Sequence, residues 1–149
     1  MSGRIVLISE HASPLAALGS VDAGGQNLYV AQVARHLAGL GKHVDVFTRR
    51  DDPDQPESVA WVPGVRVIHV PAGPAEPLPK EDLWVHMPAF ADWMEGWLRR
   101  ERDVELIHAN FWMSGYVAAE LGRRCGLPFV VTFHALGRIR QLYQGEADG

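Results

Sequence analysis

A formal charge of −4 spread over 149 residues excludes a basic field of the kind that binds nucleic acid or an anionic membrane. With 47% hydrophobic and 21% charged residues, the composition is that of one ordinary globular domain with its own core. No apolar run reaches the roughly 18 residues of a membrane-spanning helix, no signal peptide opens the chain, and Cys125 is the only cysteine, so we expect a cytoplasmic protein.

Buried strands alternate with amphipathic helices along the chain. Short apolar runs predict strands at residues 4–9, 43–48, 65–70, 104–109 and 129–134. Apolar residues at helical spacing predict helices at 26–40, 81–102 and 112–125, the second with a kink or restart at Pro88. The polar stretches 49–63 and 71–79, which contain prolines, are expected to be loops. This alternation predicts a Rossmann-like α/β fold, with a doubly wound, mainly parallel sheet and helices on both faces.

Adjacent glycines lie between the first strand and the first helix, in the segment from Asp22 to Val30. Gly24 and Gly25 let backbone N–H groups approach a ligand without a Cβ in the way. The helix N-terminus that follows favours an anion such as a phosphate. Because doubly wound sheets bind ligands beyond the carboxyl ends of their strands, the other strand ends indicate what surrounds this turn.

Polar, charged and aromatic side chains gather at those strand ends and in the segments beside them. The set consists of Glu10, His11, Lys80, His108, Asn110, Phe111, His134, Arg138 and Arg140. Such a mixture suits a phosphorylated or polyhydroxylated ligand. The histidines have no i, i+4 pair or cysteine partner, so no metal site is expected. Solvated surface cations remain the alternative for the lysine and the two arginines beyond the last strand.

An NAD(P)-dependent oxidoreductase domain is one alternative function. The dinucleotide fingerprint is absent because Gly24 and Gly25 are adjacent, and no acidic residue ends the second strand. Arg49 and Arg50 stand there instead, where an arginine pair can accept a 2′-phosphate. A stand-alone module that binds sugar phosphates is the other alternative.

Four segments resemble, in order and spacing, the N-terminal domain of retaining GT-B glycosyltransferases of family 4. They are residues 22–30, 80–84, 108–112 and 132–138. The resemblance points to the branch of sucrose-phosphate synthase, sucrose synthase and the inositol-phosphate N-acetylglucosaminyltransferase of mycothiol synthesis. It implies that residues 1–149 form the acceptor-binding half of a GT-B fold, and that the nucleotide-sugar-binding C-terminal domain is absent. The polar end of the chain also suggests a piece of a longer protein.

The resemblance implies transfer of a hexose, with retention, from UDP or another nucleoside diphosphate to a sugar or sugar phosphate. Gly24 and Gly25 would lie near the donor diphosphate and the transferred sugar, and His134 would be the catalytic residue that stabilises charge as the donor bond breaks. The residues expected to bind the acceptor are Gln26, Asn27, Lys80, Asn110, Phe111, Arg138 and Arg140. No metal or redox cofactor is implied, and we expect the chain to be inactive without its C-terminal partner domain.

Three positions depart from the phosphate-using branches of this family. Ala135 stands where those branches have a hydroxyl residue, Phe111 where they have tyrosine, and Arg140 where they have lysine. Lys80, by contrast, matches the phosphate-using pattern. The sequence therefore leaves the acceptor open between a sugar and a sugar phosphate.

Overall fold

The computed structural model describes residues 3–11, 13–15, 25–101 and 103–132. Its strands are β1 (Arg4–Ile8), β2 (His43–Arg49), β3 (Ser58–Val62), β4 (Val65–Val70), β5 (Val104–Asn110) and β6 (Phe129–Thr132). Its helices are α1 (Gly25–Gly39), α2 (Met87–Arg100) and α3 (Trp112–Cys125), with single 3-10 turns η2 (Lys80–Asp82) and η3 (Trp84–His86) before α2. None of the described helices is long and apolar enough to cross a membrane.

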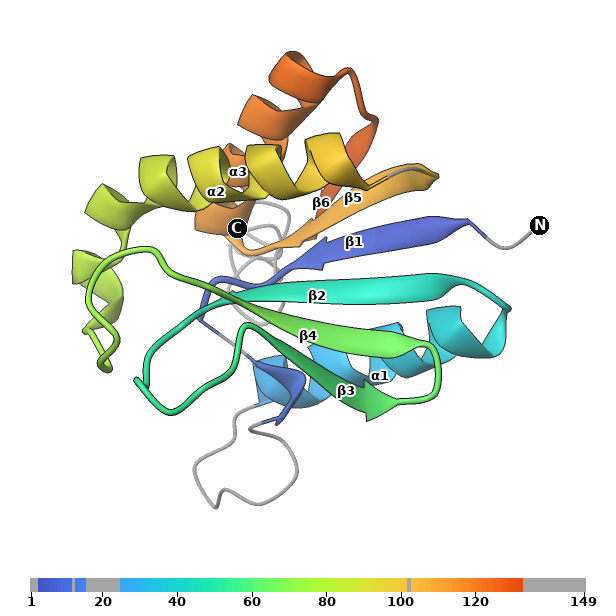
Figure 1. Ribbon diagram of the computed structural model, residues 1–149, viewed down its shortest axis with the longest axis horizontal. Helices are drawn as coiled ribbons and strands as arrows, with labels where there is room; N and C mark the ends of the chain where they lie inside the picture. The colour runs from blue at the N-terminus through green and yellow to red at the C-terminus, as the bar shows by residue number, and fades with distance from the viewer. Residues whose placement is uncertain (1–2, 12, 16–24, 102, 133–149) are drawn as a thin grey trace, which may run out of the picture.

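The strands form one sheet in the order β3-β4-β2-β1-β5-β6. Every neighbouring pair is parallel except β3 and β4, which are antiparallel. In Figure 1 the parallel strands run from right to left, so their carboxyl ends share the left side of the sheet. Because β1 is central and β2 lies next to it, the ends of these two strands are flanked by neighbouring elements on both sides.

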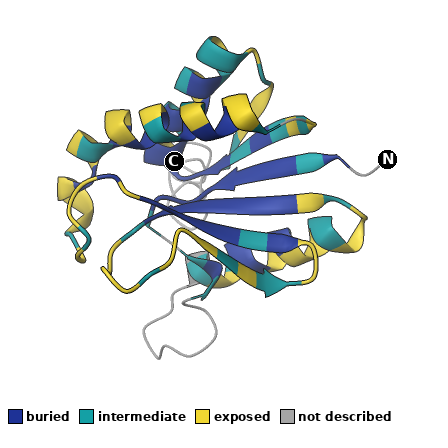
Figure 2. Cartoon of the chain, viewed as in Figure 1, coloured by how far each residue is buried: buried dark blue, intermediate teal, exposed yellow. Residues whose placement is uncertain are grey.

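Helices cover both faces of the sheet, as expected for a doubly wound fold (Figure 1). Successive side chains of a strand point to opposite faces, and β1 follows this rule. Val6 and Ile8 pack with α2 and α3, whereas Ile5 and Leu7 pack with α1. The central strands are therefore buried on both sides, which Figure 2 shows as dark blue ribbons between helices with exposed outer faces.

The stretch expected to be a loop between residues 49 and 63 contains strand β3, so that prediction was wrong in part. Residue exposure alternates weakly along β3, which is an edge strand with only one neighbour. Pro63 and Gly64 connect it to β4, and the positive φ of 86° at Gly64 fits the Pro-Gly signature of a type II turn. The strand was not predicted because it is short and has a proline on either side, a composition typical of a loop.

The helix predicted over residues 81–102 is divided into η2, η3 and α2. Pro88 lies in the first turn of α2, where its missing N–H costs nothing, so the predicted restart is confirmed. The apolar face predicted for this region is confirmed as well, since all of its members are buried: Leu83, Met87, Phe90, Met94, Trp97 and Leu98.

Candidate functional site

A cleft of about 420 Å³ lies at the carboxyl ends of β1 and β2. The position is the one where doubly wound sheets bind ligands. Its walls come from the residues after β1, the first turn of α1, the end of β2 with the loop that follows, and the segment that leads into α2. The lining residues are Glu10, His11, Ser13, Leu15, Asn27, Thr48, Arg49, Asp51, Gln55, Pro77, Leu78 and Leu83.

Glu10 and His11 form a hydrogen-bonded pair directly after β1. The side chain of Glu10 is fully buried, and its Oε1 lies 3.0 Å from Nδ1 of His11. Ser114, at the start of α3, donates its hydroxyl hydrogen to Oε2 of Glu10 and accepts the backbone N–H of Glu10 at 3.1 Å. Nε2 of His11 is closed off from solvent and has no hydrogen-bond partner among the described residues.

Phe111 occupies a strained backbone position between β5 and α3. Its φ of 80° and ψ of 160° lie in a region that glycine alone adopts readily, at a cost of about 1–3 kcal/mol for other residues. The strain is held by the bond from its N–H to the carbonyl of Thr132 at 2.9 Å and by the bond that its carbonyl accepts from Gly115 at 3.0 Å. The resulting direction places its ring against that of His11, with centroids 4.4 Å apart. Backbone strain of this kind is often found at functional sites.

Arg49 anchors the loop that forms the opposite wall of the cleft. Its guanidinium is buried at the end of β2 and donates to the carbonyl oxygens of Pro74 at 2.7 Å and Glu76 at 2.6 Å, with longer bonds to those of Arg50 and Ala72. Burial lowers the pKa of Arg49, against the attraction of Asp51 and Glu76. Because the guanidinium is engaged with backbone, the arginine pair at this strand end is poorly suited to bind a 2′-phosphate.

Among the predicted site residues, Asn27 lines the cleft directly. Its Nδ2 donates to the carbonyl of Ser13 at 3.0 Å, which ties α1 to the segment after β1. Gly25 and Gln26 form the start of the same helix. Lys80 begins η2 two residues after Leu78 of the cleft wall, and its side chain is exposed.

Asn110 and Phe111 close the cleft region from the side of β5. Asn110 is buried, and its Nδ2 donates to the carbonyl of Ile8 at 3.1 Å, so it joins β5 to β1 at their carboxyl ends. Neither residue lines the cleft; Phe111 reaches it through His11. Four predicted site residues lie outside the described part of the chain: Gly24, His134, Arg138 and Arg140.

His108 has a structural environment on β5. Its Nε2 lies 2.6 Å from Oγ1 of Thr132 on β6, and burial lowers its pKa. Within the described residues, no three histidine, cysteine, aspartate or glutamate side chains gather as a metal site requires.

Of the residues that line the cleft, Asn27 alone was predicted to bind the acceptor; His11 was noted only for its place at a strand end, and Arg49 only in the alternative 2′-phosphate site. The signal for His11 was present in the sequence, since it follows a central buried strand. The anchoring role of Arg49 has no local signal, because three of its four carbonyl partners lie more than twenty residues away in the chain.

Comparison with known proteins identifies the family of the chain that carries this cleft. The model of the glycosyl transferase 4-like domain matches residues 24–148. The chain belongs to this family. A D-inositol 3-phosphate glycosyltransferase of Acidothermus cellulolyticus is 44% identical over 147 residues, which cover 97% of this chain and 33% of that protein. One of Kineococcus radiotolerans is 42% identical, with 97% and 34% covered.

Among solved structures, a sucrose-phosphate synthase from Thermosynechococcus elongatus superposes with a TM-score of 0.83 at 37% identity. The match covers 94% of this chain and 35% of that one. The chain therefore spans about a third of the length of the family-4 glycosyltransferases that it resembles. The Rossmann-like half of a GT-B fold is confirmed, and the family favours a glycosyltransferase over an oxidoreductase or a stand-alone binding module.

Proposed function

We propose that this chain is the acceptor-binding domain of a retaining hexosyltransferase, residues 1–149 being its N-terminal part. The whole enzyme breaks the bond between a hexose and a nucleoside diphosphate and joins the hexose to a hydroxyl of the acceptor. The donor is UDP-hexose or another nucleoside diphosphate hexose, bound mainly by a C-terminal domain outside this chain. The lone Cys125 fits the reducing cytoplasm, where we place the enzyme.

The observation that carries this proposal is the cleft beyond β1 and β2, in a chain of the glycosyl transferase 4-like family. Its walls mix hydroxyl, amide, imidazole and carboxyl groups with apolar surface from Leu15, Leu78 and Leu83. Hydroxyl-rich rings require such a combination, because their edges need hydrogen bonds while their C–H faces need apolar contact. Positive charge lies nearby at Lys80 rather than inside the cleft, where Arg49 is engaged.

The acceptor that we propose is a phosphorylated polyol or sugar. The relatives named above are a D-inositol 3-phosphate glycosyltransferase and a sucrose-phosphate synthase, both named for phosphorylated compounds. In this arrangement Gln26 and Asn27 bind acceptor hydroxyls, and Lys80, Arg138 and Arg140 bind the acceptor phosphate. Asn110 and Phe111 complete the acceptor site.

The groups that act on the donor are the two glycines at the start of α1 and His134, two residues after the end of β6. Gly24 and Gly25 approach the donor diphosphate and the transferred hexose through their backbone, at a helix N-terminus that favours anions. His134 hydrogen-bonds the transferred hexose and stabilises charge as the donor bond breaks. No metal or redox cofactor takes part in this scheme.

Calorimetric titration of the chain tests the proposal. The ligands are D-inositol 3-phosphate, fructose 6-phosphate, the unphosphorylated inositol and fructose, UDP-glucose and NADPH. We expect a phosphorylated acceptor to bind more tightly than its unphosphorylated form. Replacing Lys80 with methionine should remove most of that preference, because a charged hydrogen bond contributes about 1.5–3 kcal/mol.

Lys42→Met is the matched control, since Lys42 is paired with Glu105 at the amino ends of the strands, opposite the cleft. It should leave every affinity unchanged. Tight NADPH binding with no response to any sugar would overturn the proposal. So would repeated turnover of UDP-glucose by this chain alone, because the donor site would then not need a second domain.

A further inference from the structure

Each carboxylate oxygen of Glu10 has its own hydrogen-bond partner. An ionised carboxylate only accepts hydrogen bonds. Oε2 accepts the hydroxyl hydrogen of Ser114, whose oxygen in turn accepts the backbone N–H of Glu10. Oε1 is left for Nδ1 of His11, 3.0 Å away. Two donors thereby stabilise a carboxylate that is fully buried.

The same arrangement decides where the imidazole of His11 carries its hydrogen. Opposite an ionised Glu10, Nδ1 is the protonated nitrogen, because a carboxylate only accepts. In the neutral ring Nε2 is then an acceptor, and it is the nitrogen for which the described residues offer no partner. A buried polar atom without a partner costs about 1–3 kcal/mol, so its persistence calls for a compensating interaction.

The ring of His11 is also held from outside its plane. Phe111 packs against it through the strained backbone described above. Glu10 therefore fixes the direction and tautomer of the ring, and Phe111 restricts its tilt. His11 lines the cleft while Nε2 itself is closed off from solvent, so a group that enters the cleft supplies the missing partner by displacing the atoms that cover Nε2.

We propose that Glu10 and Ser114 are positioning residues that hold His11 as its Nδ1-protonated tautomer, so that Nε2 accepts a hydrogen bond from a hydroxyl group of a polyol in the cleft. This inference rests on the proposed function for the identity of the polyol as the sugar-type acceptor. It assigns to a buried carboxylate control over the direction in which one acceptor hydroxyl points.

Nuclear magnetic resonance of the chain with ¹⁵N-labelled histidine tests the inference directly. Long-range ¹H–¹⁵N correlation spectra, recorded at a pH where the ring is neutral, distinguish a protonated from an unprotonated ring nitrogen. The spectrum of His11→Gln identifies the signals of His11. In the unaltered chain we expect the protonated type at Nδ1 and the unprotonated type at Nε2, and the reverse pattern would overturn the inference.

Glu10→Gln separates positioning from simple packing. The glutamine carbonyl must accept the Ser114 hydroxyl, which turns the glutamine NH₂ group toward Nδ1. The ring hydrogen should therefore move to Nε2. Glu105→Gln, the same chemical change at an exposed ion pair with Lys42, should leave the spectrum of His11 unaltered. If Nδ1 stays protonated in Glu10→Gln, Glu10 does not set the tautomer and the inference fails.

Titration with D-inositol 3-phosphate completes the test. Binding should shift the Nε2 signal of His11, and Glu10→Gln should weaken binding about fivefold, equivalent to one neutral hydrogen bond. If the side-chain amide signal of Asn27 shifts while His11 does not, the polyol contact is wrong. If no signal responds to the ligand, the acceptor assignment in the proposed function fails, whereas the tautomer spectra still decide the role of Glu10.

Discussion

Arg49 and Pro74 are joined by a 2.7 Å hydrogen bond from the arginine guanidinium to the proline carbonyl. The contact ties the end of β2 to the loop over residues 71–79, which otherwise has few backbone partners of its own. Since Pro77 and Leu78 of that loop line the cleft, one buried cation supports a whole wall of the candidate site.

Replacing Arg49 with methionine should therefore lower the free energy of unfolding by about 2 kcal/mol, because the loop carbonyls lose a buried donor. Urea denaturation measures this loss, and hydrogen exchange should show reduced protection of amides between residues 71 and 79. Arg50→Met is the control: the Arg50 side chain bonds carbonyls of the exposed turn that follows it, and its loss should cost far less. Equal effects of the two changes would contradict the anchoring role.

Phe111 offers a test of backbone strain. Phe111→Gly and Phe111→Ala both remove a buried ring, so each should cost about 3–5 kcal/mol. Because alanine remains strained at a φ of 80°, the glycine variant should be the more stable of the two by about 1 kcal/mol. Urea denaturation of both variants gives the difference.

The corresponding pair at Phe90 provides the reference for this comparison. Phe90 is buried in the regular part of α2, where glycine is worse than alanine by about 1 kcal/mol. The order of stability should therefore reverse between the two positions. The same order at both would show that Phe111 is not strained.

Much of this fold is predictable because its signals are local. The five apolar strands and three helices follow from apolar runs and helical spacing, and Pro88 marks the start of α2. The expected burial of the last of these strands was wrong, because β6 lies at the edge of the sheet with Phe129 and Val130 exposed. Strand β3 was missed because a five-residue edge strand between prolines has little pattern to show. Hydrophobic periodicity reflects which residues are buried, and a half-exposed edge strand such as β3 shows little of it.

The cleft was predictable only in outline, from the rule that ligands bind beyond the carboxyl ends of strands. Its internal contacts were not. Ser114 reaches Glu10 across more than a hundred residues of chain, and Asn110 reaches the carbonyl of Ile8 in the same way. No spacing in the sequence encodes such pairs, because they depend on β5 and α3 lying beside β1.

The buried imidazole of His108 predicts a pH dependence of stability. Its pKa is lowered in the folded chain by burial, so the unfolded chain binds the proton more readily. Stability from this residue is complete above the unfolded value of about 6.5 and is lost as the pH falls below it. His108→Gln should flatten this loss, measured by urea denaturation between pH 8 and pH 5.

His43→Gln is the appropriate comparison, since His43 is exposed at the start of β2. Its pH profile should follow that of the unaltered chain. If His108→Gln also follows that profile, burial of His108 does not contribute to the acid sensitivity.

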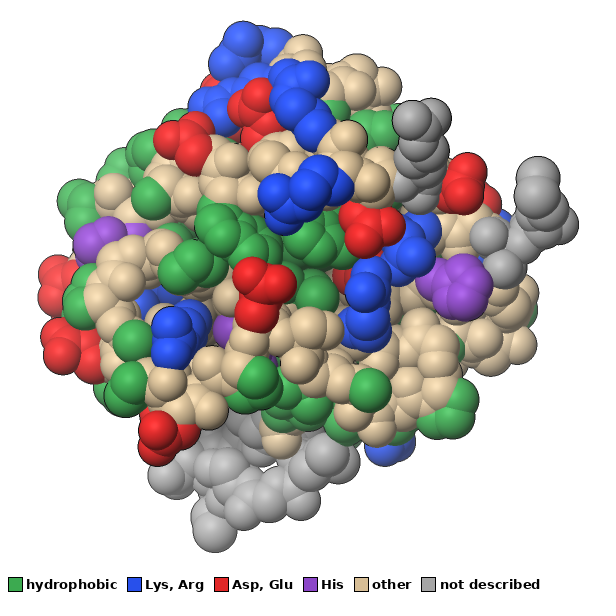
Figure 3. All heavy atoms as spheres, viewed as in Figure 1, with side chains coloured by type: hydrophobic (Ala, Val, Ile, Leu, Met, Phe, Trp, Pro, Cys, Tyr) green, Lys and Arg blue, Asp and Glu red, His purple; other side chains and the backbone are tan. Residues whose placement is uncertain are grey.

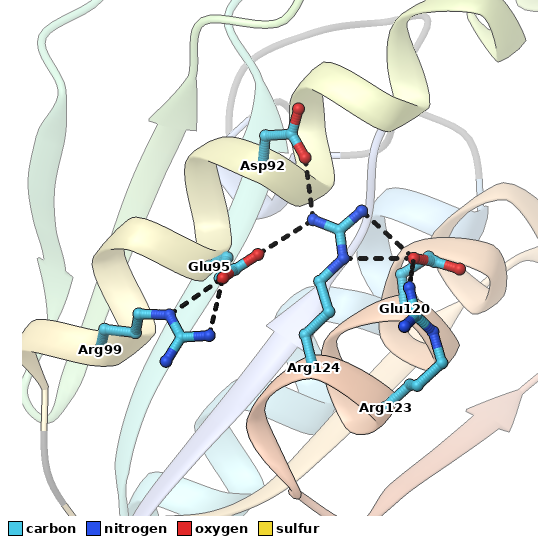
Figure 4. Close-up of polar contacts among 6 residues, drawn as sticks. All are labelled: Asp92, Glu95, Arg99, Glu120, Arg123 and Arg124. Atoms are coloured by element: carbon cyan, nitrogen blue, oxygen red, sulfur yellow. Dashed lines mark hydrogen bonds and ion pairs between the residues drawn. The ribbon is translucent and has the colours of Figure 1, made fainter.

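Arg124 connects α2 and α3 through carboxylates on both helices (Figure 4). Its guanidinium bonds Asp92 at 2.8 Å and Glu95 at 3.0 Å on α2, and Glu120 at 3.2 Å on its own helix. The hydrogen bonds to Asp92 and Glu95 raise its pKa. Side chains of both charges lie close together over this part of the surface, at the top of Figure 3.

Arg124→Met should lower the thermal midpoint more than Arg123→Met, because among the described residues Arg123 bonds one carboxylate, that of Glu120. The difference should shrink in 1 M salt, where the screening length falls to about 3 Å. Thermal unfolding at low and high salt measures both effects. A difference that persists unchanged at high salt would show that packing, rather than charge, accounts for the role of Arg124.

The central position of β1 has a consequence for how this chain is made. Arg4 pairs with Val104 on β5, which is synthesised 100 residues later. At about 5–20 residues per second, a ribosome needs on the order of ten seconds to add the intervening chain. During that interval one edge of an apolar strand lacks its neighbour, and exposed strand edges promote aggregation. Chaperones that bind nascent chains should therefore engage residues 4–8 until β5 emerges.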